Sequence, residues 1–136
     1  MPFLNTISAK EHAGLRLVLA LAANYNQAPL SLQAIAKQES LSLKYLEQLI
    51  IPLRRSGLVK SSRGRQGGYA LVKNPKQISL KNVLQILNDE PVLVSCLDKN
   101  SPCTLSKHCR SKLAWQKVEQ AVGESLEKIK LAQLLK

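Results

Sequence analysis

The sequence predicts a mostly α-helical fold with a small β-hairpin wing: a winged helix-turn-helix domain followed by a long C-terminal dimerisation helix. Hydrophobic residues make up 45% of the 136 residues but aromatic residues only 4%, so the core must come from Leu, Ile, Val and Ala, which favours helices. Apolar residues recur at helical spacing in several segments. A glycine-rich basic turn separates two short strand-like runs. We expect three parts: the winged-helix domain (1–90), a cysteine-bearing cluster loop (91–110) and the dimerisation helix (111–136).

The first half of the chain predicts three helices in the order of a helix-turn-helix. A helix over about 8–24 has an apolar face and Ser8 as its N-cap. A short second helix follows Ser31, and a turn leads to Ser42, which caps a longer third helix. Helix, short helix, tight turn and longer helix is the order of DNA-binding helix-turn-helix proteins, although other helical bundles share it.

The next segment predicts a hairpin. Strand-like runs at 58–62 and 69–72 flank the turn Arg63-Gly64-Arg65-Gln66-Gly67-Gly68. Gly64, Gly67 and Gly68 suit a sharp turn that approaches a phosphate backbone, because glycine lacks a Cβ and accepts positive φ. Arg63 and Arg65 at the tip are candidates to enter the minor groove. The alternative is an ordinary hairpin with solvated arginines.

The second half predicts two more helices around a loop. Ser79 caps a fourth helix, residues 88–91 break it, and a cysteine-bearing loop runs over about 92–109. A last helix is expected over about 110–135, with a stripe at helical spacing formed by Trp115, Val118, Val122 and Ile129. Such a terminal helix needs another surface to cover its stripe. We favour a partner helix across a two-fold axis in a homodimer over packing on its own domain.

The charge distribution indicates a polyanionic partner. The formal net charge is +11, and no acidic residue occurs from Gln48 to Asn88. Eight basic residues lie in that stretch: Arg54, Arg55, Lys60, Arg63, Arg65, Lys73, Lys76 and Lys81. Clustering on one predicted substructure favours double-stranded DNA over a merely solvated basic face. A membrane-surface protein would instead carry these charges along one amphipathic helix.

The third helix supplies candidate base-reading residues. Ser42, Lys44, Glu47 and Gln48 fall on or near its N-terminal outward face. Glutamine can pair with adenine and glutamate can accept a hydrogen bond from cytosine in the major groove. We add Arg54 to the expected DNA-binding residues. The alternative for Glu47 is a solvated helix residue. Pro52 should kink or end the regular part of this helix.

Three cysteines form a candidate metal or redox site. Cys96, Cys103 and Cys109 are spaced C-x6-C-x5-C, so their thiols can converge on one centre, and thiolates favour zinc or iron-sulfur clusters. Neighbouring lysine and arginine residues would lower thiol pKa values. An iron-sulfur cluster, zinc, a thiol switch and no site all remain open, although the lack of paired C-x-x-C knuckles argues against structural zinc.

The sequence gives no indication of an enzyme, a secreted protein or a membrane protein. Neither histidine has a sequence-evident carboxylate or serine partner, and nothing resembles a nucleophile motif. No secretory signal or membrane-spanning run is recognisable, so we expect a cytoplasmic protein whose thiols stay reduced.

The residues closely resemble the Rrf-two family of bacterial regulators, which includes the IscR, NsrR and RirA types. The resemblance is carried by YLEQLIIPLRRSGLVKSSRGRQGGYAL, HAGLRLVLALA, SLKNVLQIL and the three-cysteine loop, and it covers nearly the whole chain. It implies a dimeric winged-helix repressor or activator with long crossing C-terminal helices. It further implies a [2Fe-2S] cluster, with [4Fe-4S] as the alternative, on the three cysteines, whose state controls promoter affinity and reports iron, nitric oxide or redox conditions.

Two departures from the family pattern leave the fourth ligand open. Many members have five residues in both gaps between cysteines, but the first gap here has six, and Lys112 stands where some members have a histidine. In other members an acidic residue of the partner subunit's first helix completes the cluster. His12 occupies the matching place here, with Glu11 and His108 as further candidates; a plain surface role for His12 is the alternative. Some members lack a working cluster and are controlled by a partner protein.

Overall fold

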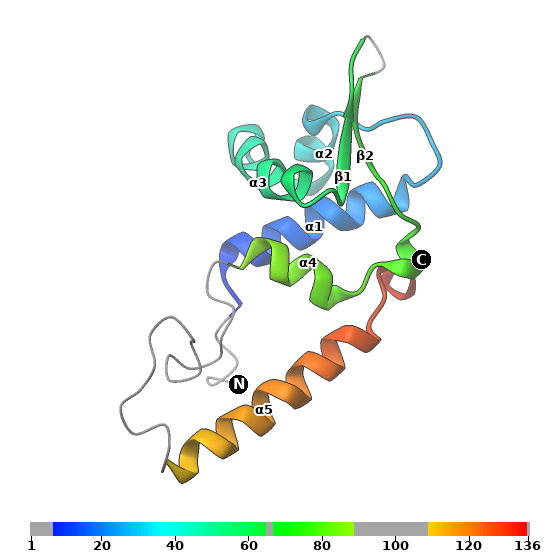
Figure 1. Cartoon of the computed structure of the whole chain (residues 1–136). Coiled ribbons are helices and arrows are strands. Elements are labelled where there is room, and N and C mark those ends of the chain that lie inside the picture. The colour runs from blue at the N-terminus through cyan, green and yellow to red at the C-terminus, as the bar shows by residue number, and fades with distance from the viewer. Residues whose placement is uncertain (1–6, 65–66, 89–108, 136) are drawn as a thin grey trace.

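The computed structural model describes residues 7–64, 67–88 and 109–135 and confirms the predicted winged-helix fold (Figure 1). Helices α1, α2, α3 and α4 form the body together with a two-stranded antiparallel wing, and α5 extends away from it (Figure 1). The elements are α1 Ala9–Ala23, α2 Leu32–Glu39, α3 Leu43–Arg55, β1 Val59–Ser62, β2 Gly68–Leu71, the 3-10 turn η2 Pro75–Gln77, α4 Leu80–Leu87, α5 Arg110–Lys128 and the 3-10 turn η4 Leu131–Leu134.

Serine residues begin all four helices of the body. The side chains of Ser8, Ser31, Ser42 and Ser79 each accept a hydrogen bond from the backbone N–H three residues further on. These bonds satisfy N–H groups that have no partner within the helix. The three predicted N-caps, Ser8, Ser42 and Ser79, are therefore confirmed, and Ser31 is a fourth.

The core of the body lies where α1 meets the other helices. Among the described residues, nineteen buried apolar residues form one cluster, and α1 contacts α2, α3, α4 and β2. Helices α1 and α4 approach so closely at Gly14 that an added Cβ would lie 2.4 Å from Cδ1 of Leu87. The absence of a side chain at Gly14 is thus part of how these two helices pack.

The wing is anchored to the segment that precedes α2. Its register pairs Val59 with Leu71 and Ser62 with Gly68. Leu30 and Tyr69 exchange backbone hydrogen bonds of 3.0 and 2.8 Å. A Cβ at Gly68 would lie 2.6 Å from the carbonyl group of Leu30, so only glycine fits there without movement of the backbone. The base of the wing is therefore held at a fixed distance from the helix-turn-helix.

The C-terminal helix is shorter than the sequence predicts, because the chain turns back onto the body. Helix α5 ends at Lys128, not near Leu135. The amide of Leu80 donates to the carbonyl of Ile129 (2.8 Å), and that of Leu131 donates to the carbonyl of Ile78 (2.9 Å). Leu131 is completely buried in the core. We call this pairing of residues 78–80 with 129–131 the joint. Ile129, predicted to belong to the partner-facing stripe, therefore lies in the joint.

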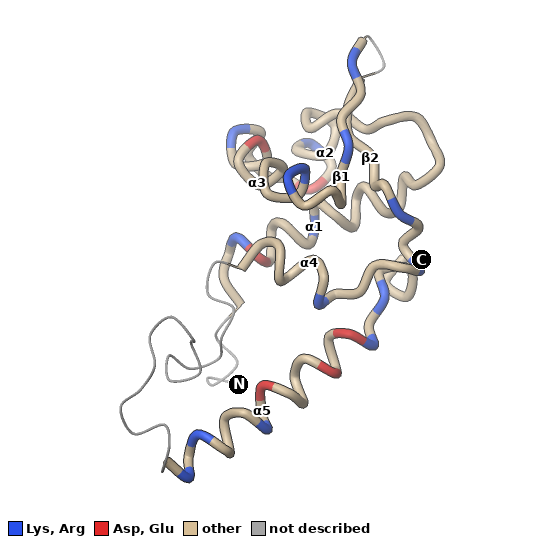
Figure 2. The backbone as a smooth tube through the Cα atoms, in the orientation of Figure 1, with Lys and Arg blue, Asp and Glu red and all other residues tan. Residues whose placement is uncertain are grey.

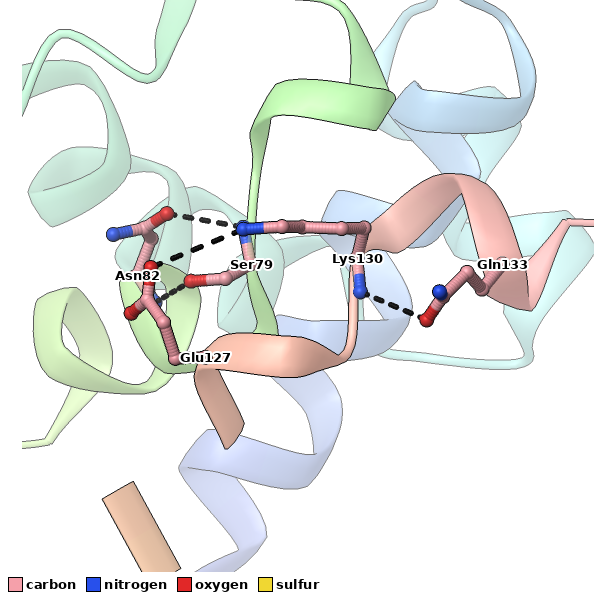
Figure 3. A network of polar contacts seen from close by, with 5 residues as sticks. All are labelled: Ser79, Asn82, Glu127, Lys130 and Gln133. Carbon is pink, nitrogen blue, oxygen red and sulfur yellow. Dashed lines mark hydrogen bonds and ion pairs between the residues drawn. The ribbon is translucent and has the colours of Figure 1, made fainter. Parts of the chain in front are cut away.

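Side chains reinforce the joint (Figure 3). Ser79 is fully buried, and its hydroxyl accepts a hydrogen bond from the backbone N–H of Asn82 (3.1 Å). Lys130 Nζ lies 3.8 Å from a carboxylate oxygen of Glu127, and the Lys130 amide donates to Gln133 Oε1 (3.1 Å). Backbone pairing and the burial of Leu131 thus hold the start of α4 against the end of α5, and these polar contacts order each of the two segments locally.

Pro52 does not end α3. The helix continues through Arg55, because the next residue, Leu53, is completely buried and packing holds the last turn in place. The alternative that α3 ends at Pro52 was therefore wrong. In the part of the chain that the structure describes, no helix has the length and apolar character needed to cross a membrane.

Candidate nucleic-acid interface

Helix α3 presents a polar face on the side opposite its core contacts. Leu46, Leu49, Ile50 and Leu53 are at most 3% exposed, whereas Lys44, Glu47 and Gln48 are exposed. Ser42 is exposed too, and its hydroxyl accepts from the Tyr45 amide (3.3 Å). That hydroxyl keeps its own proton to donate. The predicted base-reading residues are therefore accessible on one end of one helix.

The wing tip presents an accessible arginine on a turn shaped by glycine. Arg63 is exposed, and Gly64 has a φ of 107°, a conformation that disfavours any other residue. The Gly67 amide closes the turn on the Gly64 carbonyl (2.9 Å). Arg65 lies outside the described residues.

A concavity lies between α3 and the base of the wing. Its volume is about 240 Å³, and residues of α2, α3 and the wing line it: Ser31, Leu32, Gln33, Leu43, Glu47, Gly67, Gly68 and Tyr69. Glu47 therefore faces the wing side of α3. Helix α3 and the wing therefore border the same concavity and lie on one side of the molecule.

Basic residues lie on both elements that flank this concavity, α3 and the wing. Figure 2 shows Lys and Arg along the wing and at the end of α3, where Arg54 and Arg55 are both exposed. Helix α5, by contrast, carries charges of both signs (Figure 2). Apart from Glu47, the charged residues of α3 and the wing are basic, and such an excess of cations is typical of a surface that binds a phosphate backbone.

Of the three predicted cysteine ligands, Cys109 is placed by the structure. It is the N-cap residue of α5, is partly exposed, and its Sγ lies 2.9 Å from Oγ of Ser111. The Ser111 hydroxyl, followed by the nearby backbone amides of the first turn, lowers the pKa of the Cys109 thiol. Cys96 and Cys103 lie outside the described residues. Within the described ranges, no group of three His, Cys, Asp or Glu side chains could hold a metal ion.

The predicted fourth ligands are not beside Cys109 within one chain. His12 is exposed on α1, and Figure 1 shows the start of α5 well away from α1. The Glu11 carboxylate is 5% exposed and already accepts hydrogen bonds from the Ser8 hydroxyl (3.0 Å) and amide (3.4 Å). Glu11 is therefore engaged in capping α1. His108 lies outside the described residues.

Helix α5 exposes the predicted apolar stripe. Trp115, Val118 and Val122 are 39–42% exposed, and no residue of α5 is buried. Isolated helices of this length are marginal in water. The stripe thus lacks the cover that the helices of the body have.

Comparison with known proteins assigns the family. The sequence profile of the Rrf2 family, described as an iron-dependent transcriptional regulator, matches residues 7–136. This chain belongs to the Rrf2 family. Its relatives are transcriptional regulators: the regulator CymR of Bacillus subtilis is 36% identical, with 94% of this chain and 88% of CymR aligned.

Solved Rrf2-family structures have the same fold. IscR of T. potens is 35% identical over 95% of this chain and 85% of that one, with a TM-score of 0.76. The oxidised form of Staphylococcus aureus CymR is 34% identical over 95% of this chain and 94% of that one, with a TM-score of 0.73. This Rrf2-family chain is therefore similar both to a protein named IscR and to proteins named CymR.

Sequence reasoning missed two features of this Rrf2-family chain that bear on function. Ile51 and Arg55 are exposed on α3 beyond the predicted reading residues. A count of helical positions relative to the buried stripe would have placed both outside. The joint carried no comparable signal, because its strand-like pairing involves too few residues to show a periodicity.

Proposed function

We propose that this chain is a homodimeric, sequence-specific DNA-binding transcription regulator whose promoter affinity is controlled through its three cysteines. The observation that carries the proposal is the exposed polar end of α3 beside a glycine-built basic wing, followed by a stretch from Gln48 to Asn88 that contains no acidic residue. Ser42, Lys44, Glu47 and Gln48 would enter the major groove. Arg63 and Arg65 would reach the minor groove, with Arg54 near a phosphate.

A second copy of the chain supplies the missing cover for α5. The stripe of Trp115, Val118 and Val122 is uncovered in one chain, and two such helices related by a two-fold axis would bury each other's stripes. A dimer also places two α3 helices at a fixed spacing. The promoter would then contain two half-sites at the matching spacing.

The proposed sensor is an iron-sulfur cluster on Cys96, Cys103 and Cys109, with [2Fe-2S] preferred over [4Fe-4S]. The donor set fits: three thiols lie within fourteen positions, and the surroundings of Cys109 lower its thiol pKa and so favour the thiolate that a cluster requires. When bound, the group would supply redox chemistry and sensitivity to iron or nitric oxide. His12 of the partner subunit is our proposed fourth ligand.

The joint offers a path from the cysteines to the DNA. Cys109 begins α5, and the joint ties the end of α5 to the start of α4. Helix α4 contacts both α1 and α3. A reordering of the loop around Cys109 would therefore shift the body relative to the dimer helices and change the spacing of the two α3 helices.

A regulator of the same fold without a cluster is the second candidate. The likeness to CymR, described as the global cysteine regulator of B. subtilis and solved for S. aureus in an oxidised form, favours it. In this case oxidation of a low-pKa thiol such as Cys109, or a protein partner, would replace the cluster.

Anaerobic purification separates the two candidates. We expect visible absorption, together with iron and sulfide in a stoichiometry that gives the cluster type, and we expect Cys103→Ala to abolish all three. Ser101→Ala, a change in the same loop that keeps every thiol, is the control. A colourless wild-type protein that binds its promoter equally with and without iron would refute the cluster. Promoter binding that then falls on thiol oxidation would support the second candidate.

A further inference from the structure

Ile51 is an exposed apolar residue on a helix whose other apolar contacts are satisfied. Its side chain is 46% exposed, whereas its neighbour Ile50 is 3% exposed. No other large hydrophobic side chain of α3 is comparably exposed. Isoleucine is also a weaker helix former than Lys, Arg, Gln or Glu, the usual residues on the exposed face of a helix. Neither the core nor helix propensity accounts for Ile51.

Helical geometry places Ile51 in the polar row of α3. At about 100° per residue, Lys44, Gln48, Ile51 and Arg55 all lie within about 30° of the direction opposite the buried stripe. Lys44 and Ile51 are separated by seven positions, or about 10 Å along the axis, which is about three base steps. Recognition helices of other DNA-binding folds read bases over a comparable span.

The surroundings of Ile51 favour DNA over a protein partner. Its neighbours one turn away on α3 are all charged or polar, namely Glu47, Gln48, Arg54 and Arg55, so this face of α3 offers no contiguous apolar patch for a protein surface to bury. The major groove does offer an isolated apolar group, the C5 methyl of thymine, to which apolar side chains pack. One apolar side chain among charged and polar neighbours therefore suits one methyl group among phosphates and polar base edges.

We propose that Ile51 is a specificity-determining residue that packs against the C5 methyl of one thymine in each half-site. This inference rests on the proposed DNA-binding function and deepens it by assigning a base preference to the third turn of α3. Lys44 and Gln48, which lie nearer the N-terminus of α3, would contact bases or phosphates next to that thymine.

The test removes the methyl group alone. The full chain first selects its operator from a random duplex library, and each selected thymine is then replaced singly by deoxyuridine. We expect one thymine per half-site whose replacement weakens binding by about fourfold, the effect of removing one buried methyl-sized group. Ile51→Ala should weaken binding to the thymine operator similarly, and the deoxyuridine change should then have no further effect.

Matched variants keep the outcome interpretable. Leu134→Ala removes a similarly exposed apolar side chain (44%) far from α3 in sequence and should retain the full deoxyuridine effect. Circular dichroism verifies that Ile51→Ala is folded. If Ile51→Ala stays as sensitive to deoxyuridine as the wild type, or if no thymine is sensitive, the inference is wrong while the proposed function stands. If the wild type enriches no sequence, both are wrong.

Discussion

The helices of the body and helix α5 differ in how many of their apolar residues are buried and in how their first turns are capped. All of the nineteen buried apolar residues belong to the body or to the C-terminal segment that packs on it, whereas α5 buries none. Serine side chains cap the four helices of the body, while Cys109 begins α5 and pairs with the Ser111 hydroxyl without a capping bond. The body buries its apolar residues within one chain. Helix α5 does not, and its exposed apolar stripe is typical of a helix that packs against another molecule.

This contrast separates residues that stabilise the fold from residues that, in the proposed function, serve assembly and sensing. A serine at position 109 would cap α5 better than cysteine does, so the fold alone does not favour the thiol. The uncovered stripe likewise weakens a monomer but suits an interface. The joint connects the two regions, and like the body it contains completely buried side chains.

The largest effect that we expect comes from breaking the joint. Leu131→Ala should lower the free energy of unfolding by about 2–5 kcal/mol, because a completely buried leucine leaves a cavity. Denaturant titration at a fixed protomer concentration measures it. Leu134→Ala, an exposed position in the same turn, should change stability by about 0.5 kcal/mol or less. Equal effects of the two variants would show that the joint is not part of the core.

The next effect concerns the stripe of α5. Val118→Glu should convert the dimer to a monomer and weaken operator binding at least about tenfold, because burying a carboxylate in an apolar interface costs several kcal/mol. Light scattering gives the molar mass. Gln116→Glu changes the charge equally on another face of α5 and should leave the dimer intact. A Val118→Glu protein that stayed dimeric would place the interface elsewhere.

The smallest effect tests the chemistry of Cys109. In a chain with Cys96→Ser and Cys103→Ser, alkylation of Cys109 should reach half its maximal rate at a lower pH when folded than in denaturant, because the folded-state pKa is lowered and the thiolate persists to lower pH. Ser111→Ala removes the leading cause and should move the profile to higher pH, while Ser125→Ala should not. Coincident folded and unfolded profiles would contradict the assigned environment.

Local signals in the sequence were sufficient for the fold. Each serine cap and the glycine-rich turn depend on residues only a few positions apart. The order of the helices and the hairpin then predicts a winged helix-turn-helix fold. The end of α5 was misjudged because the stripe continues in register through Ile129. What ends the helix is pairing with residues about fifty positions earlier, and a helical period cannot reveal that pairing.

The candidate interface was predicted less completely than the fold. Polar residues at the start of α3 are typical of a reading helix, but Ile51 was given no role until the burial pattern separated it from Ile50. The concavity between α3 and the wing depends on the pairing of Leu30 with Tyr69, which joins distant segments of the chain. No local pattern encodes it.

The salt dependence of operator binding tests the central claim, which is that the wing and α3 bind duplex DNA together. For the Arg63→Glu/Arg65→Glu double variant we predict a large drop in affinity, and a log–log salt slope that is shallower by about 0.9 for each phosphate that the wing no longer neutralises. Lys117→Glu/Lys128→Glu, with the same net charge but changes on α5, should behave like the wild type. Unchanged affinity and slope in the wing variant would contradict a DNA-gripping role for the wing.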